Sequence, residues 1–181
     1  MSIKFAKAIS YYDMAHLMKL VGRNAPFMHD PDRLNDFVKQ FDKIWIVSMR
    51  DPGVPALFNY PKEKQPYNLL QMEFHDIHVE TEEDKAAVLR RGEIYPNEEH
   101  ARTIVEFIKK AHSHDSQSND LLLTHFMMGI ARSGAVADYT TDLLGLDRKS
   151  FEALNPQIRP NKTMYKLLRK VYQSFNKIRI N

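Results

Sequence analysis

One stretch, residues 121–134 (LLLTHFMMGIARSG), constrains the fold more than any other part of the chain. Its first half is an apolar run of strand length. Its second half is a short loop, residues 127–131, that delivers Arg132 and Ser133 to the start of a helical pattern. A strand that leads through a tight loop into a helix N-terminus is suited to anions, because backbone N–H groups and a partial charge of about +0.5 lie together there. This stretch therefore predicts an anion-binding loop, which we call the cradle loop.

The rest of the chain alternates between helix and strand patterns, which indicates a single α/β domain with a central, mostly parallel sheet flanked by helices. Strands are expected at 43–49, 69–74 and 121–126, and helices at about 11–21, 31–41, 82–90, 98–111, 132–144, 148–154 and 162–178. The domain is expected to comprise N-terminal helices over 1–42, a core over 43–146 and a C-terminal helical segment over 147–181. Ligands of such sheets bind at the carboxyl ends of the strands.

Helix start and stop residues place the first two helices. Ser10 with Asp13 resembles a capping box, and Gly22 stands where a helix C-terminal cap is expected. Asp30 followed by Pro31 is typical of a cap and a first helical residue. These residues therefore predict one helix that begins after Ser10 and a second that begins at Pro31.

The composition excludes several kinds of chemistry. The chain of 181 residues contains no cysteine, so disulfides, cysteine-ligated zinc and thiolate catalysis are excluded. The net charge of +3 comes from dispersed Lys and Arg residues, which permits an anionic partner without requiring one. No window approaches about 18 uninterrupted apolar residues and no signal-peptide core is present, so we expect a cytoplasmic protein with no membrane partner.

The stretch 125–134 resembles the phosphate-binding loop of the cysteine-dependent protein tyrosine and dual-specificity phosphatases, in which His-Cys is followed by five residues and then Arg-Ser/Thr-Gly. The residues at matching positions are His125, Gly129, Arg132, Ser133 and Gly134. Phe126 stands where the family has its nucleophilic cysteine. The resemblance implies a tyrosine phosphatase-like domain of the small bacterial or phage type, with no cofactor and no metal.

The resemblance also implies roles for the residues of this loop. In the family the arginine and the loop amides hold the phosphate oxygens, which here implies a phosphate-binding loop made of His125, Met127, Met128, Gly129, Ile130, Ala131 and Arg132. His125 would support the loop geometry, and Ser133 would assist the leaving thiolate. The phenyl ring of Phe126 has no lone pair for attack, and losing a nucleophile costs on the order of 10⁶ in turnover in a serine protease. As a cysteine phosphatase the protein should therefore be inactive.

Two further segments match the family less specifically. Asp76 lies in Phe-His-Asp-Ile after the strand at 69–74, which implies a vestigial general acid. The alternative is that Asp76 only ends the strand or caps a turn. Asn155-Pro156 and the segment 159–161 (RPN) resemble loops of the small members, although a loop that ends one helix and caps the next would look identical.

The expected function is that of a catalytically inactive phosphatase-like protein, a pseudophosphatase. It would bind a phosphorylated protein or another phosphate-bearing ligand through the cradle loop. If the Phe126 ring fills the pocket, the function would instead lie on the outer surface, with a protein partner. The alternative is an active phosphatase or phosphohydrolase, in which Phe126 is an introduced substitution or a hydroxyl or water replaces the cysteine.

Other candidate sites carry less weight. The histidine pairs His75 and His78, and His112 and His114, lack a carboxylate cluster at a ligand spacing, so exposed loop histidines explain them better than a metal does. The basic residues of the last helix fall mostly on the solvent side of an amphipathic pattern, which disfavours nucleic acid. Whether residues 80–96 close over the cradle loop is left open by the sequence.

Overall fold

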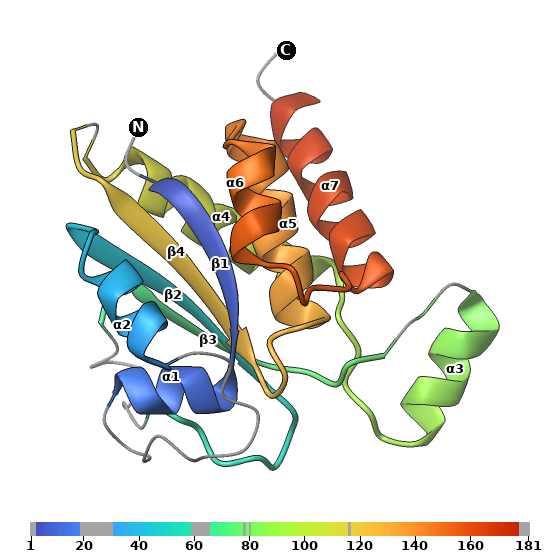
Figure 1. Cartoon of the computed structure of the whole chain (residues 1–181). Coiled ribbons are helices and arrows are strands. Elements are labelled where there is room, and N and C mark those ends of the chain that lie inside the picture. The colour runs from blue at the N-terminus through green and yellow to red at the C-terminus, as the bar shows by residue number, and fades with distance from the viewer. Residues whose placement is uncertain are drawn as a thin grey trace.

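The computed structural model describes residues 3–18, 31–58, 66–77, 79, 81–115 and 117–177, apart from the side chains of 31, 32 and 175–177. Its strands are β1 (Ile3–Ser10), β2 (Lys43–Arg50), β3 (Leu69–Glu73) and β4 (Asp120–Phe126). Its helices are α1 (Tyr11–Leu17), α2 (Pro31–Val38), α3 (Glu82–Arg90), α4 (Glu98–Ser113), α5 (Arg132–Leu144), α6 (Arg148–Leu154) and α7 (Lys162–Lys177). Figure 1 shows how the helices surround the sheet.

The sheet has the order β1-β4-β2-β3, and all its strand pairs are parallel. β4 lies between β1 and β2 and is buried along its whole length. This position explains its nearly continuous apolar sequence, because a central parallel strand is covered on both faces. The predicted α/β fold with a central parallel sheet flanked by helices is confirmed.

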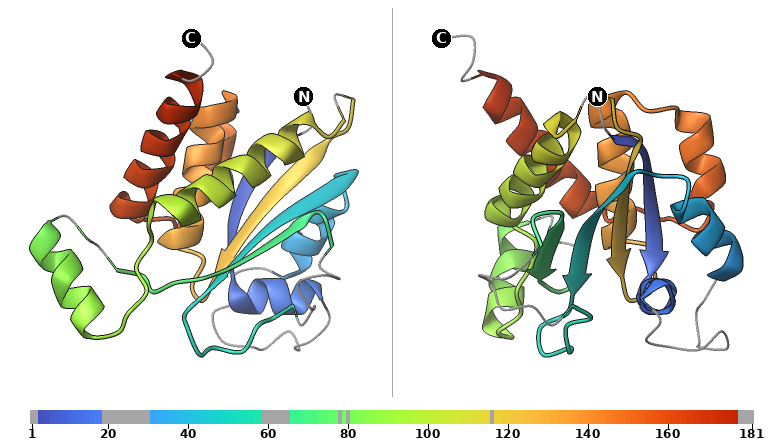
Figure 2. Two further views of the ribbon diagram at one scale, coloured as in Figure 1. Left: turned by 180° about the vertical axis from the view of Figure 1, so that it is seen from behind. Right: turned by 90° about the vertical axis from the view of Figure 1, so that its left-hand side faces the viewer.

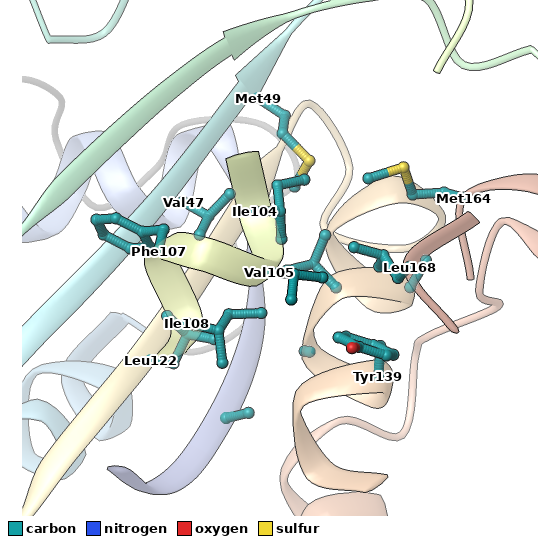
Figure 3. Packing of buried hydrophobic residues seen from close by; sticks show 14 of the residues in the cluster. Val47, Met49, Ile104, Val105, Phe107, Ile108, Leu122, Tyr139, Met164 and Leu168 are labelled. Carbon is teal, nitrogen blue, oxygen red and sulfur yellow. The ribbon is translucent and has the colours of Figure 1, made fainter. Parts of the chain in front are cut away.

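Two apolar clusters cover the two faces of the sheet. Figure 2 shows the helices and the sheet from two further directions. The larger cluster joins the sheet to α4, α5 and α7, and the smaller one joins it to α1 and α2. Figure 3 shows members of the larger cluster, including Val47, Met49, Leu122, Ile104, Val105, Ile108, Tyr139, Met164 and Leu168. Burying each such aliphatic side chain contributes about 1.5–3 kcal/mol, so these two layers fix the sheet that supports the cradle loop.

The expectation of helices alone over 1–42 is wrong, because residues 3–10 form β1. Alternation along β1 puts Phe5, Lys7 and Ile9 on one face, and the lysine interrupts an otherwise apolar row. Because of this lysine, the apolar alternation that predicts a strand is incomplete over residues 3–10. After β1 the capping box of Ser10 and Asp13 starts α1 as predicted. Gly22 and Asp30 lie outside the described residues.

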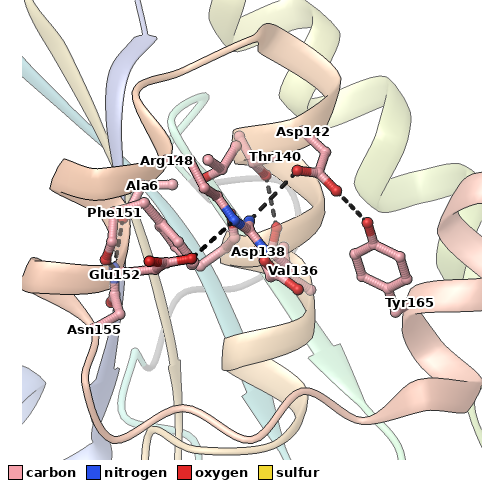
Figure 4. Close-up of polar contacts among 12 residues, drawn as sticks. Ala6, Val136, Asp138, Thr140, Asp142, Arg148, Phe151, Glu152, Asn155 and Tyr165 are labelled. Atoms are coloured by element: carbon pink, nitrogen blue, oxygen red, sulfur yellow. Dashed lines mark hydrogen bonds and ion pairs between the residues drawn. The ribbon is translucent and has the colours of Figure 1, made fainter.

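The outer edge of β1 is closed by side chains that follow α6. Asn155 is buried, and its side chain accepts a hydrogen bond from Ala8 N at 2.8 Å and donates one to Ala6 O at 3.1 Å. Gln157 donates to Ala8 O at 3.0 Å. Figure 4 shows Asn155 beside Ala6, and Arg148 joining α6 to acidic side chains of α5. These hydrogen bonds pair backbone groups of Ala6 and Ala8 at the edge of the sheet, where another strand could otherwise add.

The charged segment around α3 extends away from the sheet. Figures 1 and 2 both show α3 standing apart from the rest of the domain, and Val88 is its one buried side chain. The segment returns to the end of β3 at Ile94: His75 N donates to Ile94 O at 2.7 Å, and Ile94 N donates to His75 Nδ1 at 3.0 Å. In this structure α3 therefore does not cover the cradle loop.

Candidate functional site

The cradle loop is held by its carbonyl groups. Met127 O accepts from Tyr11 N at 3.2 Å, Ile130 O accepts from Arg159 N at 3.2 Å, and Ala131 O accepts from Asn161 N at 3.1 Å. Because a trans peptide directs its C=O and its N–H to opposite sides, the N–H groups of the residues that follow point away from these three neighbours. Those amides belong to Met128, Ala131 and Arg132. The loop therefore keeps several backbone donors directed away from its supports.

Gly129 lets the loop lie directly on the end of β1. It is buried and has a φ of +69°, in the left-handed region that favours glycine. A Cβ at this position would lie 2.4 Å from the carbonyl carbon of Ile9 and 2.6 Å from Ser10 N. The chain thus needs glycine here both for its backbone conformation and for the close approach of two backbones.

Phe126 and Arg132 occupy the centre of the candidate site together. The guanidinium carbon of Arg132 lies 3.2 Å from the centroid of the Phe126 ring. The Arg132 side chain has 0% exposed surface, and Phe126 is also buried. A cation over an aromatic ring is stabilised by about 2 kcal/mol when both are removed from water. In this arrangement the arginine cannot meet a ligand from solvent without moving.

Two carboxylates from neighbouring strand ends balance the charge of Arg132. Its Nη2 lies 3.0 Å from Asp51 Oδ1, its Nε lies 3.8 Å from Asp76 Oδ1, and its Nη1 donates to Phe74 O. Burial lowers the pKa of the Arg132 guanidinium, and Asp76 and Asp51 oppose that shift. Arg132 is the first residue of α5, where the helix dipole disfavours a cation. The two carboxylates therefore supply the negative charge that this helix end and arginine require.

Asp76 is held in place from the other side by Asn161. Asn161 Nδ2 donates to Asp76 Oδ1 at 2.7 Å, and Asn161 Oδ1 accepts from Met164 N at 3.0 Å at the start of α7. The backbone N–H of Asn161 donates to the cradle loop at Ala131 O. A single asparagine thus links the acid, the cradle loop and α7.

The structure brings Asp76, Phe126 and Arg132 together but directs His125 elsewhere. His125 follows Leu123 on the face of β4 that α1 and α2 cover, and its ring centroid lies 5.8 Å from that of Phe58. Within the described part of the chain neither ring nitrogen has a hydrogen-bond partner. Ser133 is buried, and its hydroxyl also has no partner among the described residues. Among the described residues, neither side chain therefore makes a hydrogen bond to the cradle loop.

Burial of His125 predicts an acid-sensitive stability. Desolvation lowers the pKa of His125 from 6.5 to about 3, so the folded protein keeps the ring neutral while the unfolded chain binds a proton below pH 6.5. The free energy of unfolding should therefore fall by up to about 1.4 kcal/mol per pH unit as the pH drops from 6.5 toward 3. Urea unfolding of the unaltered protein and of His125→Leu near pH 7 and near pH 5 checks this.

In His125→Leu the loss of stability between these two conditions should shrink by about 2 kcal/mol. His112→Gln is the comparison variant: burial also lowers the pKa of His112, in α4, but less than that of the fully buried His125, so the loss should shrink by less than in His125→Leu. An unchanged acid sensitivity in His125→Leu would show that another group causes it.

Sequence reasoning missed Asp51 and the anchoring role of Asn161. Asp51 directly follows β2, and Asp76 lies shortly after β3, the neighbouring strand. The carboxyl ends of parallel strands meet at one edge of the sheet, so the position of Asp51 alone was a usable signal. The contact of Asn161 with Asp76 spans 85 residues of sequence, and no local pattern indicated it.

The described part of the chain contains neither a candidate metal site nor a candidate membrane span. In the ranges that the structure describes, no group of three or more His, Asp or Glu side chains could hold a metal ion. His78, one of the weaker metal candidates, lies outside those ranges. No described helix combines the length and the apolar character needed to cross a bilayer.

Comparison with known proteins gives limited information. No protein-family model matches the chain, and no curated protein gives a match. Among solved structures, the chain is similar to one described as "Crystal structure of Tk-PTP in the active form". The two share 17% sequence identity with a TM-score of 0.43, and the match covers 81% of this chain and 88% of that chain. At this level of similarity the neighbour assigns no role to any residue of this chain.

Proposed function

We propose that this protein is a pseudophosphatase that acts as a binding module, with a cradle loop closed by its own side chains. The observation that carries the proposal is the buried stack of Arg132 on Phe126, with 3.2 Å between the guanidinium carbon and the ring centroid. The sequence resemblance over 125–134 supplies the family, and the absence of cysteine removes its nucleophile. The partner would then be a protein that binds the outer surface.

The closed state of the cradle loop follows from charge as well as from shape. A phosphate in such a loop would be held by amides, by the helix N-terminus and by arginine. Here Asp51 and Asp76 already face the arginine, and the Phe126 ring lies directly against it. An incoming oxyanion would therefore have to displace a carboxylate contact and an aromatic contact at the same time.

Oxyanion binding and turnover by the unaltered protein test this proposal. We expect no hydrolysis of para-nitrophenyl phosphate above the buffer rate and no heat of tungstate binding in calorimetry. Asp51→Asn should make tungstate binding measurable by calorimetry, because it removes a negative charge 3.0 Å from Arg132. Asp36→Asn is the matched control, since Asp36 is an exposed acid on α2 that pairs with Lys39.

Two outcomes would contradict the proposal. Turnover by the unaltered protein that Arg132→Ala abolishes would favour the alternative function, a phosphohydrolase with water or a hydroxyl as nucleophile. Tight tungstate binding by the unaltered protein would mean that the stack opens readily, and a phosphate-binding module would replace the closed one.

A further inference from the structure

The helix α3 projects from the domain and has an exposed outer face. Figures 1 and 2 show it apart from the other helices, and Val88 is its one buried side chain. Successive residues of an α-helix are rotated by about 100°, so five exposed residues of α3 fall within about 120° of one another, on the side opposite to Val88. These residues form what we call the arm face: Glu82, Glu83, Ala86, Leu89 and Arg90.

The arm face lacks the packing that a helix of this length needs. A capping box between Thr81 and Asp84 starts α3, but the helix has only nine residues. Isolated helices shorter than about 12–15 residues are marginal in water and depend on tertiary contacts. Leu89 has 57% exposed surface, more than any other large apolar side chain in the described part of the chain. Contact of another helix with the arm face would supply the missing packing and cover Leu89.

The charges of the arm face are arranged so that the face is complementary to itself. Glu83 lies in the first turn of α3 and Arg90 in the last. Neither side chain forms an ion pair with any residue that the structure describes. When two copies of α3 lie antiparallel about a two-fold axis near Ala86, Glu83 of each copy lies beside Arg90 of the other. A parallel arrangement would bring like charges together, and the helix dipoles also favour the antiparallel one.

The centre of the arm face permits a close approach of two helices. Ala86 lies opposite Val88 on the helix, and a small side chain at the contact allows axes about 8–10 Å apart. Because Cα atoms lie about 2.3 Å from the helix axis, the two Ala86 Cα atoms would be about 3.5–5.5 Å apart. Leu89 is next to Ala86 on the same face, so the second helix would cover it as well.

We propose that the arm face of α3 binds the arm face of a second copy of this chain, in an antiparallel pair with two-fold symmetry. Apolar contact at Ala86 and Leu89 and two symmetric pairs of Glu83 with Arg90 hold the copies together. The interface is independent of the proposed pseudophosphatase function, because α3 does not cover the cradle loop. Two short helices bury less than about 1,200 Å², so we expect a weak dimer with a Kd of about 10–100 µM.

Sedimentation velocity of the unaltered protein from about 5 to 500 µM tests this interface, and a monomer–dimer transition is expected within that range. Glu83→Arg and Arg90→Glu each bring like charges together, so each should weaken the dimer at least about tenfold. A mixture of these two variants pairs a basic face with an acidic one and should dimerise at least as tightly as the unaltered protein. Glu106→Arg on α4 and Lys166→Glu on α7, both at exposed positions, are the matched controls and should leave dimerisation unchanged.

A single introduced thiol locates the two-fold axis, because the chain contains no cysteine. Ala86→Cys should form disulfide-linked dimers with diamide as oxidant, since the facing Cα atoms fall in the range of about 4.4–6.8 Å that a disulfide spans. Ala87→Cys, rotated by about 100° from the centre of the arm face, is the matched control and should cross-link at least about tenfold more slowly.

Three results would overturn the proposal. The first is an unaltered protein that stays monomeric up to about 500 µM. The second is a dimer that Glu83→Arg and Arg90→Glu both leave intact, which would show self-association through another surface. The third is equal cross-linking of Ala86→Cys and Ala87→Cys, which would show random collisions rather than a defined pair of helices.

Discussion

Phe126→Cys is expected to hydrolyse para-nitrophenyl phosphate at least about 100-fold faster than the unaltered protein, a fraction of the roughly 10⁶-fold effect of a catalytic nucleophile. The substitution removes the ring that stacks on Arg132 and places a thiol at the end of β4. A cation and a helix N-terminus beside a cysteine lower its pKa and favour the reactive thiolate. Asp76, fixed by Asn161 at 2.7 Å and lying 3.8 Å from Arg132, is the expected acid for the leaving group in this variant.

Phe126→Ser is the matched control for this gain of activity. It removes the same ring and opens the same space, but an unaided hydroxyl is a weak nucleophile, so no turnover is expected. Asp76→Asn in the Phe126→Cys background should lower the restored rate by about 10²-fold or more. A folded Phe126→Cys protein that stays inert would show that the cradle loop no longer holds a phosphate in a reactive geometry. Pseudophosphatase function would then rest on surface contacts alone.

Much of the fold could be predicted because its patterns are local. The strands β2, β3 and β4 and the helices α3 to α7 follow from apolar periodicity and from cap residues such as Asn97, and each begins and ends within about two residues of its expected limits. β1 was missed because Lys7 interrupts its alternation.

The candidate site was only partly predictable. Asp76 and Arg132 were both expected there, since strand ends converge at one edge of a parallel sheet, and the structure brings them within 3.8 Å. Asp51 satisfied the same rule and was overlooked, because Pro52 and Gly53 made the segment look like an ordinary turn. The opposite directions of His125 and Phe126 also follow from strand alternation alone.

The sequence alone could not predict the contacts that support closure of the cradle loop by Arg132. It depends on the stack with Phe126 and on the distances to Asp51 and Phe74, which lie 81 and 58 residues away in the chain. The sequence left open whether the ring would fill the pocket or leave it free for phosphate. The Phe126 stack and the nearby carboxylates are the observations that support the proposed closed state.

Gly129→Ala is expected to be the most damaging small substitution in the cradle loop, with a loss of about 2–5 kcal/mol in the free energy of unfolding. A left-handed conformation costs a non-glycine residue about 1–2 kcal/mol, and overpacking typically adds about 1–3 kcal/mol. The added methyl would lie 2.4 to 2.7 Å from backbone atoms of Ile9 and Ser10, which cannot move without disturbing β1 and the start of α1.

Gly53→Ala and Gly92→Ala separate the two causes of destabilisation at Gly129, the left-handed conformation and the overpacking. Both glycines have positive φ, +80° and +69°, but an added Cβ would meet nothing within 4 Å at either. Each should lose only the conformational term of about 1–2 kcal/mol in urea unfolding. In the Phe126→Cys background, Gly129→Ala should also abolish the restored turnover, whereas Gly92→Ala should not. If Gly129→Ala costs no more than these two controls, the cradle loop does not rest on β1, and the geometry on which the closed site depends would have to be abandoned.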